Sequence, residues 1–594
     1  MLMSAEQMTA CAVIGATIVF FIWGRFRYDL VAVFALLAVV LTGLVPPEQA
    51  FNGFSHPAVL TVIGVLILSR GLQNAGIIDV VLKLLGPLKG RPVMQLTGQS
   101  VIIAGLSAFM NNVGALALML PVAMRTAYRE NFPPAMILMP LAFASLLGGL
   151  ITLIGTPPNL IVSSFRQSAA GQSYAMFDFA PVGLAVAVAG IAFISLIGWR
   201  LIPRDRRRAM GADAALDIED YITEVRAGKD SKAVGRTIGE IKSAAEGEVY
   251  VVALVRQDRK YPDPPGDEPL EPDDILILEG NPDALKSVID DAGLSLVGDK
   301  EASLQTSMPE EIGIVEAIVA PQSKLINRSS ASLRLRSAYG INLLAISRHG
   351  RRISARLKDV RFRSGDVMLL HGPASTLPEA LAELHWLPLA ERNLGIGRPR
   401  RLLLAGSLFG GAILATILGL LPVQIAFIGA AALMAASGIL KLDELYDSID
   451  WPVIVLIGAM FPIGTALETT GTAAYLADAV LGSVDGMAPV WALLILLVAT
   501  MFLSDVINNS ATALVMAPIG VSMAAQLGTS ADPFLMAVAV GSSCAFLTPI
   551  GHQNNALILE PGGYRFGDYW RMGLPLELVI TAVAVPTILV VWPF

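Results

Sequence analysis

The chain has 594 residues, of which 54% are hydrophobic and only 15% are charged, and its formal net charge is −7 at pH 7. Such a composition excludes an ordinary soluble protein and gives no sign of a nucleic-acid partner. Two cysteines in apolar stretches, Cys11 and Cys544, exclude a disulfide framework or a metal-binding cysteine cluster.

The first part of the chain contains predicted membrane spans and one interrupted apolar stretch. The first span has neither a basic start nor a small-residue cleavage site, so we interpret it as a retained helix, not a signal peptide. Asn111 and Asn112 interrupt the stretch 97–123. The predicted spans lie near 9–24, 29–45, 57–74, 134–165 and 176–202.

Basic residues mark one side of the membrane. They occur in alternate loops, and the intervening loops have almost none, so the positive-inside rule requires 97–123 to be a re-entrant hairpin. The first half then crosses an odd number of times, which places the charge-rich residues 204–401 in the cytoplasm of a multi-pass inner (plasma) membrane protein. The basic residues are Arg25, Arg27, Lys83, Lys89, Arg91, Arg125, Arg129 and Arg204 to Arg208.

The second half repeats the polar landmarks of the first. FMNNVGALALMLPV, with Asn112, matches VINNSATALVMAPI, with Asn509, and LIGTPPNLIV, with Gly155, matches PIGHQNNALI, with Gly551. The first offset is 397 and the second 396, and an almost constant offset between polar landmarks is not expected by chance. With an odd number of crossings in each unit, the two copies must be inverted, an architecture typical of transporters.

The cytoplasmic insert is itself duplicated, at an offset of 92. VYVVALVRQD and INLLAISRHG predict strands, as do DDILILEG and GDVMLLHG. We therefore expect two small α+β domains between two inverted helical repeats, with the domains at 1–203, 216–298, 308–390 and 400–594. The matching pairs are Lys232 and Lys324, Arg256 and Arg348, Asp274 and Asp366, and Gly280 and Gly372.

The interrupted apolar stretches predict broken helices that line a cavity, because backbone at membrane depth leaves helical geometry only there or inside protein. A helix that restarts near Asn159, or after Asn112 or Asn509, exposes N–H groups that favour an anion. Carbonyls of the broken turns suit a small cation such as sodium. Alternatively, the asparagines only bond neighbouring helices and the prolines only kink them.

Two ionisable residues occur in the second copy alone. Asp505 precedes Asn509 by four residues and His552 lies in the second broken segment, whereas their counterparts are Ala108 and Thr156. Asp505 is interpreted as a cation ligand, a proton carrier or a residue at a wet vestibule. For His552 a structural role is favoured.

These residues resemble the divalent anion:sodium symporter (DASS) family of the ion-transporter superfamily. The resemblance covers both membrane halves, through NNVGALALMLPV with GTPPN and NNSATALVMAPI with PIGHQNN. It implies a substrate site at Asn111, Asn112, Val113, Asn508, Asn509, Ser510, Thr156 and Pro158. It implies sodium sites at Ser107, Asn111, Asn112 and Gly155, and at Ser504, Ile507, Asn509 and Gly551, with Asp505 as a further candidate. The tips lack most hydroxyls of the family's Ser-Asn-Thr pattern, and His552 and Gln553 replace its Thr-Pro step.

The two inserted domains resemble the TrkA-C (RCK-C) ligand-binding domain, through KAVGRTIGEI, EPDDILILEG and RSGDVMLLHG. A pair of such domains is similar to the sulfate-type branch of DASS transporters. The resemblance implies sulfate slightly ahead of a dicarboxylate, elevator-like transport, a homodimer and a nucleotide or other small regulator on the insert.

Other functions stay open. A cation/proton antiporter or arsenite-type efflux transporter would use Asp505 to carry protons, and a membrane ligand sensor would need no turnover. An intramembrane hydrolase is disfavoured, because Asp505 has no evident acidic partner at depth and no nucleophile–base spacing is present.

Overall fold

The computed structural model describes residues 3–77, 92–129, 132–203, 399–482 and 488–594 and, with gaps, 221–388. It divides into two compact units, a helical unit (mainly 1–207 and 395–594) and a unit containing 208–394. Several sequence predictions lie outside the described residues: the domain edges at 216, 298, 308 and 390, and the basic residues Lys83, Lys89, Arg91, Arg204 to Arg208 and Lys324.

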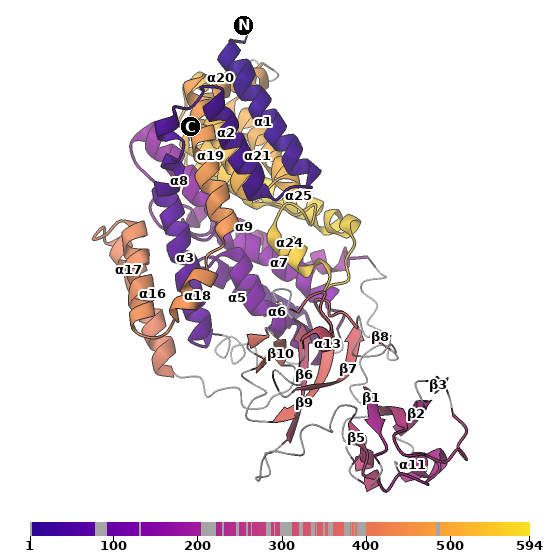
Figure 1. Cartoon of the computed structure of the whole chain (residues 1–594). Helices are drawn as coiled ribbons and strands as arrows, with labels where there is room; N and C mark the ends of the chain where they lie inside the picture. Colours follow the sequence, from indigo (N-terminus) through magenta and orange to yellow (C-terminus); the bar gives the residue numbers. More distant parts are fainter. Residues whose placement is uncertain are drawn as a thin grey trace. The chain divides into compact units, whose positions relative to one another are not determined.

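The helical unit follows the predicted apolar runs (Figure 1). The predicted span 134–165 is two helices separated by a break, and 97–123 is two helices joined by the residues 108–111. The helices of the first half are α1 (Ala5–Trp23), α2 (Tyr28–Leu41), α3 (Pro57–Asn74), α5 (Pro92–Ser107), α6 (Asn112–Arg129), α7 (Ala135–Gly149), α8 (Pro157–Ala170) and α9 (Ala180–Leu196).

The second half has a similar sequence of long helices, together with the short helices α18 (Leu442–Asp447) and α20 (Thr472–Leu481). The other helices of this half are α16 (Pro399–Ile417), α17 (Val423–Ala436), α19 (Trp451–Thr469), α21 (Pro489–Val506), α22 (Asn509–Leu527), α23 (Asp532–Ser543), α24 (Gln553–Leu559) and α25 (Tyr569–Val591).

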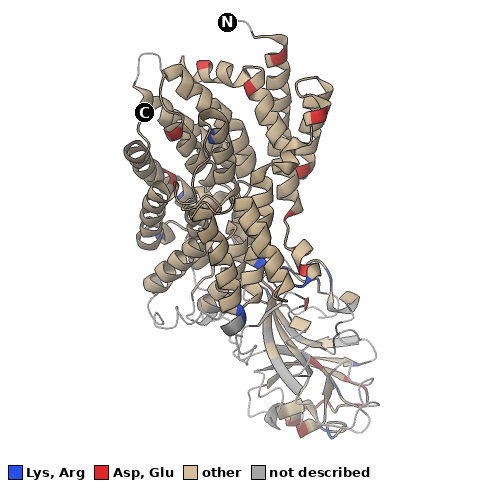
Figure 2. Ribbon diagram, turned by 90° about the vertical axis from the view of Figure 1, so that its left-hand side faces the viewer, with Lys and Arg blue, Asp and Glu red and all other residues tan. Residues whose placement is uncertain are grey.

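Local sequence explains where these helices begin and end. Proline occupies the first helical position of α3, α8 and α21, where its missing N–H has no intrahelical partner to lose. Glycine with positive φ ends α1 and α8, at Gly24 and Gly171. Among the described residues six helices are long and apolar enough to cross a membrane. Lys, Arg, Asp and Glu are sparse along them (Figure 2).

Corresponding helices of the two halves make corresponding contacts. α2 packs against α19 and α17 packs against α3, so in each of these pairs a helix of one half contacts a helix of the other half. α5 packs on α6 and α7 as α21 packs on α22 and α23, and α9 packs against α25. The helical unit therefore contains two groups: α2, α3, α17 and α19, and the hairpins with the broken helices and α9 and α25.

The other unit contains two antiparallel five-stranded sheets with one topology. The first has the order β3-β2-β4-β1-β5 and the second, in reverse, β8-β7-β9-β6-β10. The predicted strands are confirmed as β2, β4, β7 and β9. The strands are β1 (Tyr221–Arg226), β2 (Val249–Arg256), β3 (Arg259–Pro262), β4 (Ile275–Gly280), β5 (Ser295–Leu296), β6 (Ile312–Val319), β7 (Asn342–Arg348), β8 (Arg351–Arg352), β9 (Val367–Pro373) and β10 (Trp386–Pro388).

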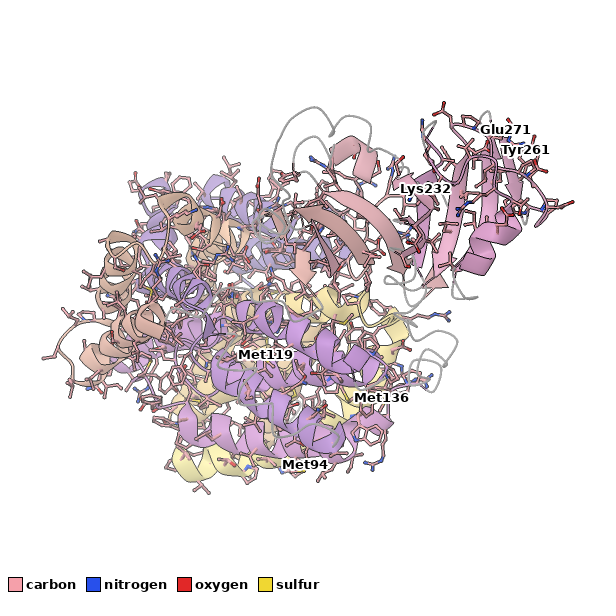
Figure 3. The ribbon with its side chains drawn as sticks, turned by 90° about the horizontal axis from the view of Figure 1, so that it is seen from below. Met94, Met119, Met136, Lys232, Tyr261 and Glu271 are labelled. Atoms are coloured by element: carbon pink, nitrogen blue, oxygen red, sulfur yellow. The ribbon has the colours of Figure 1, made fainter. Side chains whose placement is uncertain are left out.

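The two sheets also share their irregularities. A register shift between Val251 and Ala253 in β2 recurs between Leu343 and Ala345 in β7, at the offset of 92 seen in the sequence. In the view with side chains, Tyr261 of β3 and Glu271, which precedes β4, lie together at one end of the first sheet (Figure 3).

Each sheet is pinned by one buried carboxylate. Asp274 accepts from Arg256 (Nη2 to Oδ2, 2.7 Å), and Asp366 accepts from Arg348 (Nε to Oδ1, 2.7 Å). Each carboxylate also accepts a backbone N–H three residues earlier. The carboxylate neighbours hold the pKa of the Arg256 guanidinium above its ordinary value.

We expect Asp366→Ala to lower the free energy of unfolding of the second sheet by about 2–4 kcal/mol, because it leaves a half-buried guanidinium without its carboxylate. The measurement is thermal unfolding of the full protein, with trypsin cleavage within 312–388 as a local readout. Asp273→Gly is the control, since Asp273 has a φ of 70°, which glycine adopts without strain, and its ion pair with Arg226 spans 4.0 Å. Equal stability of the two variants would contradict the prediction.

Candidate functional site

The first hairpin is closed around Asn112. Ser107 Oγ and the Asn112 amide lie 2.5 Å apart at the end of α5 and the start of α6. The amide orientation that satisfies its neighbours directs the nitrogen to the carbonyls of Ser145 (3.2 Å) and Gly155 (3.3 Å). Asn112 therefore ties the hairpin tip to both sides of the break between α7 and α8.

A glycine permits this approach. A Cβ at Gly149 would lie 2.5 Å from Asn112 Oδ1, well inside van der Waals contact. Asn111 and Val113, which flank Asn112, are partly exposed, whereas Asn112 is buried. Asn111 and Val113 are therefore accessible at the tip, whereas the buried Asn112 bonds the surrounding residues and stabilises the tip.

The two broken segments have the same internal hydrogen bonds. Asn159 Nδ2 donates to the carbonyls of Gly149 (3.2 Å) and Thr152 (2.8 Å). Asn555 Nδ2 donates to those of Ala545 (2.7 Å) and Thr548 (3.0 Å).

A threonine at the offset of 396 also bonds each hairpin: Thr152 Oγ1 donates to the Ala108 carbonyl and Thr548 Oγ1 to that of Asp505 (2.5 Å). Each asparagine therefore hydrogen-bonds two carbonyls of its own break, and each threonine hydrogen-bonds a carbonyl of the neighbouring hairpin.

A proline or a capping side chain sets the start of the helix after each break. α8 starts at Pro157, two residues earlier than the predicted restart near Asn159, since proline is favoured at the first helical position. Thr156 precedes it, fully buried, and its hydroxyl has no hydrogen-bond partner among the described residues. Pro158 is buried directly behind.

In the second copy, His552 takes the place of Thr156. His552 Nδ1 accepts the Asn554 N–H at 3.0 Å and so caps α24. This contact agrees with a structural role for His552.

The second hairpin tip is built from the predicted residues. Asn508 caps α22, its Oδ1 accepting the Ser510 N–H at 2.9 Å, and Asn509 Oδ1 accepts the same N–H at 2.8 Å. Asn509 and Ser510 are buried, and Asn508 is partly exposed. Ile507 ends α21 in extended backbone, so the chain leaves helical geometry here.

This hairpin and the second break touch at Ser504 and Gly551. Ser504 Oγ donates to the Ser542 carbonyl at 2.5 Å. A Cβ at Gly551 would lie 2.6 Å from the Ser504 carbonyl oxygen. Two residues proposed for the second sodium site, Ser504 and Gly551, therefore meet where the hairpin contacts the break, and Ile507 and Asn509 belong to the same hairpin.

Asn554 links the two halves, a contact that the sequence reading missed. Its Nδ2 donates to the Asn112 carbonyl (3.2 Å) and to Ser145 Oγ (2.5 Å). α24 thus begins beside the start of α6, while α8 packs against α22. The consecutive amide residues in GHQNN indicated a polar contact at this position, but only the packing shows that Asn554 bonds residues of the first half.

The expectation that Asp505 has no acidic partner is wrong. Its carboxyl group lies against that of Glu577, in the middle of α25, and the two residues are 2% and 5% exposed. Asp505 Oδ1 accepts the Leu547 N–H at 2.7 Å. Asp505 Oδ2 and Glu577 Oε1 have no hydrogen-bond partner among the described residues.

Two carboxylates this close repel each other when both are ionised, so a shared proton or a bound cation would stabilise the pair. The titratable neighbour that the structure gives this pair is the buried thiol of Cys544. The large separation in sequence between Asp505 and Glu577 hid this pair of buried carboxyl groups.

Apolar helices with two hairpins and two broken helices, tipped by neutral amides, define a multi-pass secondary transporter. The sequence matches the family model described as citrate transporter (CitMHS) over residues 18–541 and 493–594. The chain belongs to this family of the ion-transporter superfamily, and it is a transporter, not an enzyme.

Three relatives match most of the length of the chain. It is 31% identical to the uncharacterized transporter sll0640 of Synechocystis, over 96% of this chain and 94% of the relative. It is 28% identical to the uncharacterized transporter YfbS of Escherichia coli over 100% of both chains. It is 22% identical to the probable sodium/sulfate cotransporter 3 of Chlamydomonas reinhardtii, over 91% of this chain and 83% of the relative.

Proposed function

We propose that the chain is a sodium-coupled symporter of a divalent anion, with a sulfate-type oxyanion ahead of a dicarboxylate. The observation that carries this proposal is the contact between hairpin tips and broken helices, which gathers helix N-termini, amide side chains and carbonyls and, among the described residues there, neither lysine nor arginine. N–H groups at helix starts favour an anion, and carbonyl and hydroxyl oxygens suit sodium. The sodium/sulfate cotransporter among its relatives supports the same substrate class.

The anion would contact the tips Asn111, Asn112, Val113 and Asn508, Asn509, Ser510, together with Thr156 and Pro158. Sodium would bind at Ser107, Asn111, Asn112 and Gly155 in the first copy. In the second copy it would bind at Ser504, Ile507, Asn509 and Gly551, with Asp505 beside them. The unpartnered, fully buried hydroxyl of Thr156 fits such a site, because a bound ion would complete it.

We further propose that 1–203 and 400–594 are inverted repeats that move by an elevator-like mechanism. The matched contacts of α2 with α19 and α17 with α3, and the matched ties of Asn159 and Asn555, support the repeat. The domains 216–298 and 308–390 would be TrkA-C-like modules that bind a nucleotide or other small regulator. The protein would act as a homodimer, with the insert in the cytoplasm.

The test is thermal stabilisation of the purified protein by sulfate, succinate and arsenite, each with and without sodium. A ligand that binds the native state stabilises it by about 2.7 kcal/mol at a concentration of 100 times its Kd. We expect a sodium-dependent shift with sulfate. A shift with arsenite alone, or one independent of sodium, would contradict the proposal.

Gly551→Ala should weaken the second sodium site selectively. The new Cβ would meet backbone atoms, Ser504 O at 2.6 Å and Asp505 Cα at 2.9 Å, which cannot swing aside. Overpacking of this kind costs about 1–3 kcal/mol, so we expect the sodium concentration for half-maximal uptake to rise roughly tenfold. Gly105→Ala on α5 is the matched control, because nothing lies within 4 Å of its Cβ. An unchanged sodium requirement in Gly551→Ala would remove Gly551 from the site.

A second candidate function is proton coupling, in a cation/proton antiporter or efflux transporter. The observation that favours it is the buried pair of Asp505 and Glu577, which needs one positive charge. The direction of flux and its pH dependence in Asp505→Asn separate this candidate from sodium symport.

A further inference from the structure

Gln553, the first residue of α24, reaches the other group of helices. Gln553 Nε2 donates to the Tyr28 hydroxyl at 2.9 Å, and the same side chain lies against the Asp450 carboxyl group. Tyr28 is the first residue of α2 and Asp450 precedes α19. Because α2 and α19 pack together, one amide ties the second broken helix to both.

The contact of Gln553 with Tyr28 and Asp450 can break and re-form at low cost in free energy. Gln553, Tyr28 and Asp450 are all half-buried, so water can replace each partner. Burial raises the pKa of Asp450, and its charged neighbours are Asp29 and Arg27, which pair with each other at 3.0 Å. Since Gln553 is neutral, parting the contact leaves no unpaired cation, and each hydrogen bond is worth about 1 kcal/mol net.

A separate contact joins the start of α3 to the first broken helix. His56 directly precedes α3, and His56 Nε2 lies 2.9 Å from Ser164 Oγ, within α8. Here the two groups of helices leave a cavity of about 820 Å³, lined by residues that include His56, Ser164, Tyr174 and Gln424. On the proposed inverted topology, α3 and α19 start at opposite membrane faces, so this cavity opens outward.

We propose that Tyr28, Asp450 and Gln553 form a cytosolic latch. The latch holds α24 against α2 and α19 while the outer cavity is open, and it parts before the anion is released into the cytosol. This inference rests on the proposed transport function and adds to it the positioning role of Gln553.

The test is a reversible cross-link. Tyr28→Cys and Gln553→Cys are combined in a Cys11→Ser background, since the other cysteine, Cys544, is fully buried. A short bifunctional methanethiosulfonate should join the pair and stop sodium-dependent sulfate uptake almost completely, and a reducing agent should restore it. Thermal stabilisation by sulfate with sodium should persist in the cross-linked protein, because the binding site stays intact.

The matched control is Asn74→Cys with Glu444→Cys. These exposed residues of α3 and α18 lie 2.6 Å apart at their side-chain atoms and belong to elements outside the hairpins and broken helices. Cross-linking them should leave uptake unchanged. Uptake at the untreated rate in the cross-linked Tyr28–Gln553 pair would overturn the latch. Absence of sodium-dependent uptake before cross-linking would instead overturn the proposed function.

Tyr28→Phe supplies a kinetic readout. Loss of one bond shifts the population of the latched state by up to about fivefold, so the KM for external anion should rise by up to that factor while kcat changes little. A purely structural role would instead lower kcat and thermal stability and leave KM unchanged, and that result would overturn the latch.

Discussion

Asn112→Ala and Asn509→Ala are each expected to abolish sodium-dependent uptake. Asn112 is the support of its hairpin tip, since its amide serves Ser107 and the carbonyls of Ser145 and Gly155. Each buried partner left unsatisfied costs about 1–3 kcal/mol, so the loss should exceed roughly 100-fold. Asn509 Oδ1 accepts from the start of α22 in the same way.

The measurement is radiolabelled sulfate uptake into proteoliposomes with and without a sodium gradient. Asn74→Ala is the control, because its amide bonds only the exposed Glu444 in the contacts described. A monodisperse, folded Asn112→Ala protein without uptake would locate the effect in the site. Unchanged sodium-dependent uptake in both variants would show that the proposed site is wrong.

Glu577→Gln and Asp505→Asn should keep the fold and lose cation coupling. An amide can donate to the remaining carboxylate, so each variant satisfies the pair without a shared proton or cation. We expect cation-dependent uptake to fall by more than about tenfold, since one added charge at this site no longer has a place to bind. Asp505→Ala should instead unfold more easily, by about 2–4 kcal/mol, because it strands Glu577 and the Leu547 N–H.

Uptake at varied sodium concentration and pH separates the two coupling ions. Loss of sodium dependence alone would assign the pair to sodium, and loss of pH dependence alone would assign it to protons. Glu560→Gln, an exposed carboxyl just after α24, is the control. Both dependences unchanged in Glu577→Gln would show that the pair has only a structural role.

Local polar signals in the sequence predicted the broken elements well. Asparagines inside apolar stretches marked the starts of α6 and α22, at Asn112 and Asn509, because such residues cap helices and interrupt them. Pro157 and Pro158 marked the break for an equally local reason, although α8 starts at Pro157 and not near Asn159 as predicted. The strands of the insert followed from alternating apolar residues between turn residues.

Contacts that join distant helices could not be predicted in the same way. Glu577 lies in an apolar helix, and only the packing of α25 on α21 brings it to Asp505. Asn554 bonds the first half although it belongs to the second, and Gln553 meets Tyr28 from the far end of the chain. A sequence repeat shows which residues occupy matching positions in the two halves. It does not show which residues at different positions are in contact.

The hydrogen bonds of Asn159 and Asn555 within the two breaks have a consequence for a transporter that has released its substrate. A symporter must return without its cargo, and a broken helix that relied on ions to occupy its carbonyls would lose that support on the way back. Here an amide from the following helix bonds two carbonyls of each break. If the chain is the symporter proposed above, these amide bonds would keep the binding geometry of the unloaded protein through the return step.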